Sequence, residues 1–382
     1  MENRIRELDG LRGIAVLLVM AGHIFKRAAY FTENPTLNAI TGITNIGWSG
    51  VDIFFTLSGF LITSILLRAR NEQHYFKNFY VRRILRIFPL YYVAIVVVLL
   101  FVPNIEPEFT RELGKILPLM LLYQQNWIPL IKGLYLTQYL GITWSLAIEE
   151  QFYFIWPFVV YKLNHEQLMK VSVGYIIFSL IARTLVTIFW PDLGQASAFF
   201  YFSSFARFEE LLFGGLLAVF LSYDGALQKI KRFSMGVFVT SLSVFIVLCL
   251  LSLPGVPNPG SSSIPLMLGG YTSIALYSVG LIGVFITYSP QNIVRRFFKI
   301  PLLTFFGKYS YSMYLFHMIP TLFLLDVFWH SGMRGWKPYV LYIVTTYVIT
   351  IVISLLTWNF LEKHMLNLKR YFEYENPKGK IN

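Results

Sequence analysis

Long apolar runs separated by short polar segments extend along almost the whole chain. A helix that crosses a bilayer needs about 20 mainly apolar residues, and ten such stretches can be drawn in this sequence. The pattern therefore predicts an all-α, polytopic transmembrane helical bundle of about ten spans. The predicted spans are residues 11–30, 47–67, 87–103, 141–161, 171–190, 205–223, 236–254, 266–288, 302–325 and 338–361.

One further apolar stretch, residues 116–140, is interrupted by Gln124, Gln125, Asn126, Pro129, Lys132 and Gly133. Basic loops stay on the cytoplasmic side of a membrane, and most basic loops share one side only if this stretch does not cross. We therefore expect both termini in the cytoplasm and a re-entrant or interfacial segment near 116–140, covered by neighbouring protein. Residues 1–361 would form the transmembrane domain, and residues 362–382 a cytosolic polar tail.

Composition supports the membrane assignment, because 56% of the residues are hydrophobic and only 14% are charged, against about a quarter charged in soluble domains. The net charge of +12 does not indicate nucleic-acid binding, since the basic residues lie between apolar runs, where they set topology and meet anionic lipid head groups. The only cysteine, Cys249, excludes an intramolecular disulfide. The basic and apolar N-terminus lacks a cleavage pattern and is interpreted as a retained first span.

Ionisable residues inside apolar runs are the first candidates for chemistry, because they are costly in lipid and usually face the bundle interior. In the first span, Arg12 and His23 lie within about 20° of one helical stripe and about 16 Å apart along the axis. A cation at the cytosolic mouth and a titratable imidazole deeper on the same face suit a long anionic ligand. His23 is the candidate general base; a structural hydrogen bond is the competing interpretation.

A basic cluster precedes the third span in the segment FKNFYVRRILRIFPLYY. Arg82, Arg83 and Arg86 could simply fix topology, but guanidinium groups also bind phosphate in bidentate fashion. A phosphorylated donor such as a coenzyme A thioester would bind there, with Arg12 further along its path.

The segment GITWSLAIEEQFYFIWP places Glu149 and Glu150 beside Trp144 and Ser145. Adjacent helical residues project about 100° apart, so at most one of the two carboxylates can point at a given site. A carboxylate near His23 could hold its tautomer and stabilise the imidazolium. The competing interpretation pairs both with buried arginines or with water.

Two weaker candidates are Asp52, which lies among glycines suited to close helix packing, and His317. Each could support a site or be only an interhelical partner. Nucleophile-elbow, Walker and H-E-x-x-H motifs are missing from the sequence, and the histidines lack metal-ligand spacing, so neither a metal nor a permanently bound cofactor is expected. From the residues alone, an acyltransferase and a transporter or flippase for a glycolipid or proton-coupled solute are about equally supported.

Taken together, RELDGLRGIAVLLVMAGHIF, GVDIFFTLSGFLI, FYVRRILRIFPLYY, WSLAIEEQFYFIWP and GKYSYSMYLFHMIP resemble the acyltransferase 3 family of integral-membrane O-acyltransferases. The resemblance covers about residues 4–361 and depends on the spacing of Arg12 and His23 together with the W-S-L-x-x-E-E segment.

The resemblance implies a bacterial inner-membrane enzyme that transfers an acyl group, usually acetyl from acetyl-CoA, to a hydroxyl of a surface polysaccharide, lipid-linked glycan or glycoside. By position, His23 matches the catalytic histidine, Arg12 its paired arginine, Arg83 and Arg86 the donor-binding pair, and Glu149 and Glu150 the acidic pair. Some members carry an extra helix and an external esterase-like domain, which we do not expect here. Acceptor, acyl chain and oligomeric state stay open.

Overall fold

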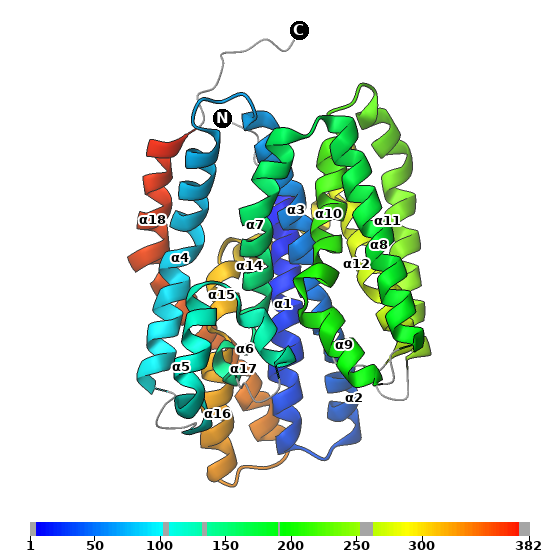
Figure 1. Cartoon of the computed structure of the whole chain (residues 1–382). Coiled ribbons are helices and arrows are strands. Elements are labelled where there is room, and N and C mark those ends of the chain that lie inside the picture. The colour runs from blue at the N-terminus through cyan, green and yellow to red at the C-terminus, as the bar shows by residue number, and fades with distance from the viewer. Residues whose placement is uncertain (1–4, 102–106, 132–135, 190–191, 253–262, 374–382) are drawn as a thin grey trace.

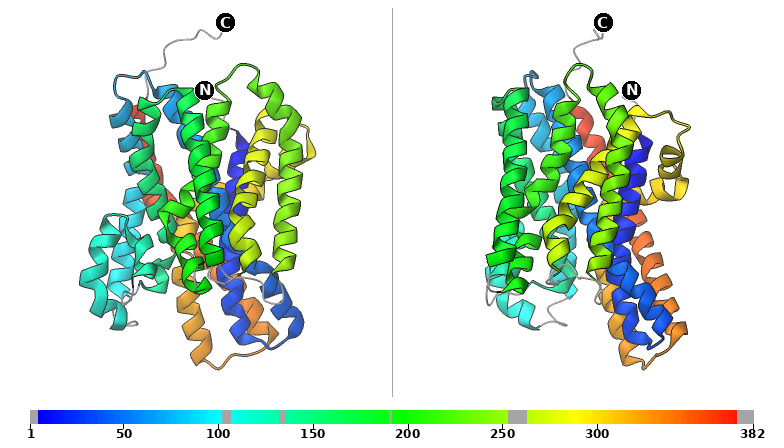
Figure 2. Two further views of the ribbon diagram at one scale, coloured as in Figure 1. Left: turned by 45° about the vertical axis from the view of Figure 1, so that its right-hand side comes forward. Right: turned by 90° about the vertical axis from the view of Figure 1, so that its right-hand side faces the viewer.

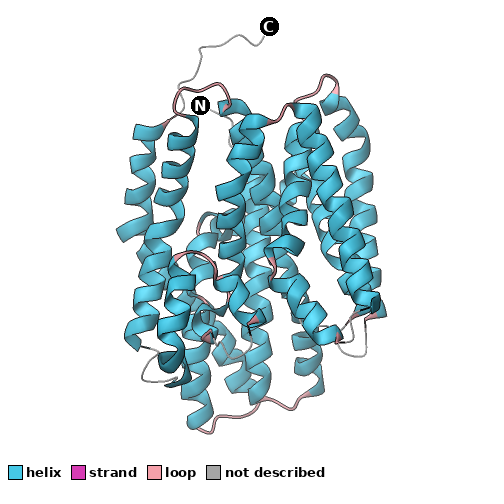
Figure 3. Ribbon diagram, viewed as in Figure 1, coloured by secondary structure: helices cyan, strands magenta, loops and turns pink. Residues whose placement is uncertain are grey.

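The computed structural model describes residues 5–101, 107–131, 136–189, 192–252 and 263–373. Every regular element in these ranges is a helix (Figure 3). The helices run mostly side by side along one axis, as the three views show (Figures 1 and 2). The all-α fold class predicted from the apolar pattern is therefore confirmed.

Nine of the ten predicted spans each coincide with one helix: α1 (Arg6–Ala28), α3 (Ser49–Ala69), α4 (Tyr75–Phe101), α7 (Trp144–Lys162), α8 (His165–Phe189), α10 (Ser204–Phe220), α11 (Ala226–Leu251), α12 (Tyr271–Thr287) and α17 (Trp336–Thr357). The tenth, residues 302–325, is instead divided among α14 (Pro301–Lys308), α15 (Ser310–Phe316) and α16 (Met318–His330). The shorter elements include η1 (Ala29–Phe31), α2 (Pro35–Thr44), η2 (Asn45–Trp48), η5 (Leu266–Gly270) and α13 (Ile293–Phe298).

Eight helical stretches of the described chain are long and apolar enough to cross a membrane. Helices α7 and α10 are not among the eight; α7 carries Glu149 and Glu150, and α10 carries Arg207, Glu209 and Glu210. The protein is therefore an integral membrane protein, whereas ten crossings with cytoplasmic termini stay a prediction. The first residues of α1 and helix α18 (Lys363–Asn367) lie at the same end of the bundle (Figure 1), which we call the proximal end.

The interrupted stretch near 116–140 forms short helices: α5 (Pro107–Leu121), η4 (Gln125–Leu130) and α6 (Gln138–Gly141). Helices α5 and α6 both lie in the half of the bundle away from the proximal end (Figure 1). The 3-10 helix η4 packs against α7 and against α9 (Leu193–Phe202). Neighbouring protein therefore covers this irregular backbone, as expected for a segment that does not cross.

Helix α1 lies inside the bundle and packs closely on α3 and α14. Glycine makes this contact possible, because a Cβ added at Gly13 would lie 2.0 Å from the carbonyl oxygen of Leu303 in α14. Helices α3 and α10 also approach closely, since a Cβ at Gly59 would lie 1.8 Å from the carbonyl oxygen of Leu211. The prediction of close packing around the glycines of α3 is confirmed, and α1 is held where its side chains face other helices rather than lipid.

The chain continues as helix beyond the predicted domain boundary at residue 361, through η6 (Trp358–Glu362), α18 and η7 (Leu368–Phe372). Both α18 and η7 pack against α4. Asn78 and Arg82 of α4 donate hydrogen bonds to the carbonyls of Glu373 and Phe372, at 3.1 and 3.3 Å. This first part of the polar tail therefore covers α4, and residues 374–382 lie outside the described part of the chain.

Candidate functional site

Three cavities follow one another along α1 and α3. The proximal cavity, of about 580 Å³, includes Asp9, Arg12 and Leu61 in its wall. The middle cavity, of about 100 Å³, shares Arg12 and Leu61 with it. The distal cavity, of about 730 Å³, shares Val51 and Tyr314 with the middle cavity. The shared walls place the three cavities in series through the bundle.

His23 lines the distal cavity, so α1 turns the imidazole toward the bundle interior as the helical stripe predicts. Its Nδ1 lies 3.1 Å from Nε2 of His317. One turn further, Arg27 donates to the carbonyl of His23 at 3.1 Å and to the side chain of Gln138 in α6 at 3.0 Å. The ring that hydrogen-bonds His23 is therefore a second histidine, and the expected carboxylate partner is not observed among the described residues.

The middle cavity brings together three of the four predicted donor-binding residues. Arg12, Arg83 and Arg86 line it from α1 and α4, and Glu149 lines it from α7. The Glu149 carboxylate accepts a hydrogen bond from the Ser58 hydroxyl at 2.6 Å. Three guanidinium groups facing one carboxylate give this cavity an excess of positive charge, which suits phosphate or another anion.

Four predicted site residues do not line any of these three cavities: Arg82, Glu150, Asp52 and His317. Arg82 points to the C-terminal segment, where it donates to the carbonyl of Phe372. Glu150 is absent from the three walls, whereas Glu149 belongs to one of them. The expectation that only one carboxylate of the adjacent pair can point at a site therefore agrees with the geometry, which favours Glu149.

Tyr314 of α15 lies between the middle and distal cavities. Its hydroxyl lies 2.5 Å from the hydroxyl of Ser145, which also lines the middle cavity. The Tyr314 hydroxyl also donates to the carbonyl of Ile142 at 2.9 Å. These hydrogen bonds, which we call the Tyr314–Ser145 tie, join α15 to the start of α7. They lie between the arginine-lined middle cavity and the distal cavity of His23.

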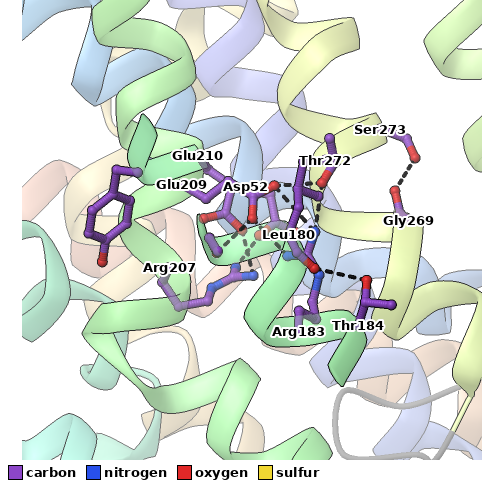
Figure 4. Close-up of polar contacts among 12 residues, drawn as sticks. Asp52, Leu180, Arg183, Thr184, Arg207, Glu209, Glu210, Gly269, Thr272 and Ser273 are labelled. Atoms are coloured by element: carbon purple, nitrogen blue, oxygen red, sulfur yellow. Dashed lines mark hydrogen bonds and ion pairs between the residues drawn. The ribbon is translucent and has the colours of Figure 1, made fainter. Parts of the chain in front are cut away.

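Asp52 belongs to a buried ion-pair network rather than to a cavity wall (Figure 4). Arg207 pairs with Asp52 and, at 2.8 Å, with Glu210. Nearby, Arg183 pairs with Glu209 at 2.9 Å. All five charged side chains are at most 1% exposed, and each of the three carboxylates pairs with one of the two arginines inside the bundle.

The network also supports the distal cavity. The Arg207 guanidinium lies 5.8 Å from the ring centres of both Trp144 and Tyr201, and both rings line that cavity. Asp52 is therefore connected to the site indirectly: it pairs with Arg207, which lies against the aromatic wall of the distal cavity. Trp144 was predicted as a supporting residue, whereas Tyr201 and Arg207 were not connected to the site by any sequence pattern.

The sequence interpretation also missed Ser58 and the partition by Tyr314. Both residues belong to sequence segments that carry candidate residues. Only the folded structure shows that Ser58 contacts Glu149 and that Tyr314 contacts Ser145. Within the described ranges, no group of three or more His, Cys, Asp or Glu side chains could hold a metal ion.

The all-helical membrane bundle combines an imidazole of α1 with a cavity lined by arginines of α1 and α4 and a carboxylate of α7, a layout that suits a membrane-embedded transferase. The chain belongs to the acyltransferase 3 family, whose acyltransferase domain matches residues 5–359. The resemblance inferred from the five sequence segments is therefore confirmed.

Relatives carry similar descriptions. Peptidoglycan O-acetyltransferase OatA of Listeria monocytogenes is 29% identical over 82% of this chain and 49% of its own length. O-acetyltransferase OatA of Staphylococcus aureus is 29% identical over 93% of this chain and 56% of its own length. The chain thus spans about half the length of the curated relatives it matches. No solved structure matches the chain.

Proposed function

We propose that this protein transfers an acetyl group from acetyl-CoA, on the cytoplasmic side of a bacterial inner membrane, to a hydroxyl of a cell-surface glycan. The observation that carries the proposal is the series of cavities along α1. It leads from the proximal end past Arg12 to the arginine-lined middle cavity, whose wall is shared with the cavity of His23.

On the donor side, the phosphates of acetyl-CoA would be held by Arg83 and Arg86, with the thioester arm extending along α1. Arg12 lines both the proximal and the middle cavity, so it lies on that path. Guanidinium groups bind phosphate oxygens through paired charge-assisted hydrogen bonds. The small volume of the middle cavity suits the diphosphate and the thin acyl-carrying arm rather than the adenosine, which would remain nearer the proximal end.

On the acceptor side, the distal cavity is larger and its walls carry the rings of Trp48, Trp144, Tyr201 and Trp329. Flat aromatic faces and a few polar groups are suited to ring-shaped, hydroxyl-bearing ligands. The names of the relatives make a peptidoglycan sugar the first acceptor to test. Lys26 and Arg27 also line this cavity, which favours an acceptor that carries an anionic group.

In the proposed reaction, His23 removes the proton of the acceptor hydroxyl while the hydroxyl oxygen attacks the carbonyl carbon of the thioester. The new C–O bond forms, the C–S bond breaks, and the coenzyme A thiol leaves with the proton returned by the imidazolium. A covalent acyl-imidazole formed on His23 and then attacked by the hydroxyl would use the same atoms in two steps.

The proposal is tested with purified protein, acetyl-CoA labelled in its acetyl group and a peptidoglycan fragment. We expect His23→Ala to lower transfer by about 10²–10⁴-fold, while His165→Ala, a substitution at the start of α8, leaves transfer unchanged. Transfer by His23→Ala at the wild-type rate would refute the site. Failure of the wild-type protein to label any glycan hydroxyl would refute the reaction.

A further inference from the structure

The structure shows a hydrogen bond between two imidazoles that the proposed reaction leaves unexplained. His317, at the junction of α15 and α16, is fully buried and contacts His23 through Nε2 at 3.1 Å. We infer that His317 is a positioning residue that fixes the tautomer of His23, so that Nε2 of His23 is the basic nitrogen facing the distal cavity. This inference rests on the proposed role of His23 as the base.

The assignment follows from the partners of His317. Its Nδ1 lies 2.8 Å from the carbonyl oxygen of Tyr314 and 3.2 Å from that of Met313. Carbonyl oxygens only accept, so this Nδ1 carries the proton. A neutral imidazole has only one N–H, and Nε2 of His317 is therefore an acceptor. The facing Nδ1 of His23 must then be the donor.

Other contacts agree with this direction. The carbonyl of Val19, one helical turn before His23, is a further acceptor next to the His23 ring. In both His317 and His330, the nitrogen that contacts a carbonyl one turn earlier is Nδ1. With its proton on Nδ1, the His23 ring keeps the lone pair of Nε2 for an acceptor hydroxyl.

The surroundings also keep His317 neutral and fixed. It is buried without exposed surface, and burial disfavours a charged imidazole. The His317 carbonyl accepts a hydrogen bond from Thr321 at 2.6 Å, and the Thr321 carbonyl accepts one from Tyr342 at 2.7 Å. These bonds attach the backbone that carries His317 to α17.

The experiment compares His317→Leu, which removes the acceptor, with His317→Gln, whose amide oxygen can occupy the place of Nε2. Transfer kinetics are measured for both, with His165→Gln as a control outside the cavities. We expect His317→Leu to lower kcat by about 10²-fold with little change in the KM for acetyl-CoA, and His317→Gln to recover at least part of that loss. Equal losses in kcat for the two variants would overturn the inference.

A second measurement does not require turnover. In ¹⁵N-histidine-labelled protein, the resonances of His23 are identified by their loss in His23→Gln. We expect wild-type His23 to show a protonated Nδ1 and an unprotonated Nε2, and His317→Leu to show a mixture of both tautomers. The same His23 spectrum in wild type and His317→Leu would overturn the inference. If instead the spectra change as expected but no protein transfers acetyl groups, the proposed function fails and the tautomer assignment stands.

Discussion

The arginines before the middle of α4 give the sharpest test of how the donor binds. Arg82, Arg83 and Arg86 are all half-buried, but only Arg83 and Arg86 line the middle cavity, while Arg82 bonds the carbonyl of Phe372. The three residues are alike in sequence. The structure predicts that they differ in function.

The perturbation is Arg86→Ala, and separately Arg83→Ala. Each removes one charged donor from the cavity, and hydrogen bonds to charged groups contribute about 1.5–3 kcal/mol. At 1.4 kcal/mol for each tenfold change, the KM for acetyl-CoA should rise by about 10- to 150-fold. Since neither guanidinium contacts His23, kcat at saturating donor should change much less.

The matched control is Arg82→Ala, which removes the same charge from the same helix. Initial rates are measured against acetyl-CoA concentration for all three variants in detergent, after size-exclusion chromatography has shown each to be monodisperse. We expect Arg82→Ala to leave the donor KM within about twofold of wild type, a change below 0.5 kcal/mol. A rise in KM with Arg82→Ala equal to that with Arg86→Ala would refute the distinction between the residues.

Two further predictions concern the buried network and the tie between the cavities. Arg207→Met leaves the carboxylates of Asp52 and Glu210 without their cation, so it should destabilise the protein by about 3–5 kcal/mol. The thermal unfolding temperature in detergent should fall in this variant and should partly recover in the double variant Arg207→Met with Asp52→Asn. An unchanged unfolding temperature for the single variant would contradict this. Tyr314→Phe removes the hydroxyl that binds Ser145 and Ile142, so acceptor-independent hydrolysis of acetyl-CoA should rise relative to transfer; an unchanged ratio would show that the tie does not separate the cavities.

The helices could be predicted from sequence because lipid imposes a simple rule on them. A helix must remain apolar for most of the bilayer thickness, and α8, α11 and α17 follow that rule clearly. Residues 302–325 were predicted as one span, and the stretch long and apolar enough to cross begins later, at Ser310, and ends at His330. Helices α14, α15 and α16 pack against α1, and α15 and α16 also pack against α17; the sequence does not show these contacts.

The site was predictable where its residues share one helix. Arg12 and His23 could be placed on one face of α1 from their spacing alone. The contact of His23 with His317 could not, because it joins residues 294 positions apart. For the same reason, the sequence could show that Glu149 and Glu150 diverge, but not that Glu149 would be the one to meet Ser58.

The arrangement of the cavities also explains why one rigid helix carries both Arg12 and His23. In the proposed reaction, the donor and the acceptor reach the base from opposite sides of the bilayer, so the base must lie at a depth that both can reach. Helix α1 carries that base and is in close contact with α14 at Gly13. The tie of Tyr314 to Ser145 then keeps the two cavities separate. In the proposed reaction, the thioester would have to pass this contact between α15 and α7 to reach His23.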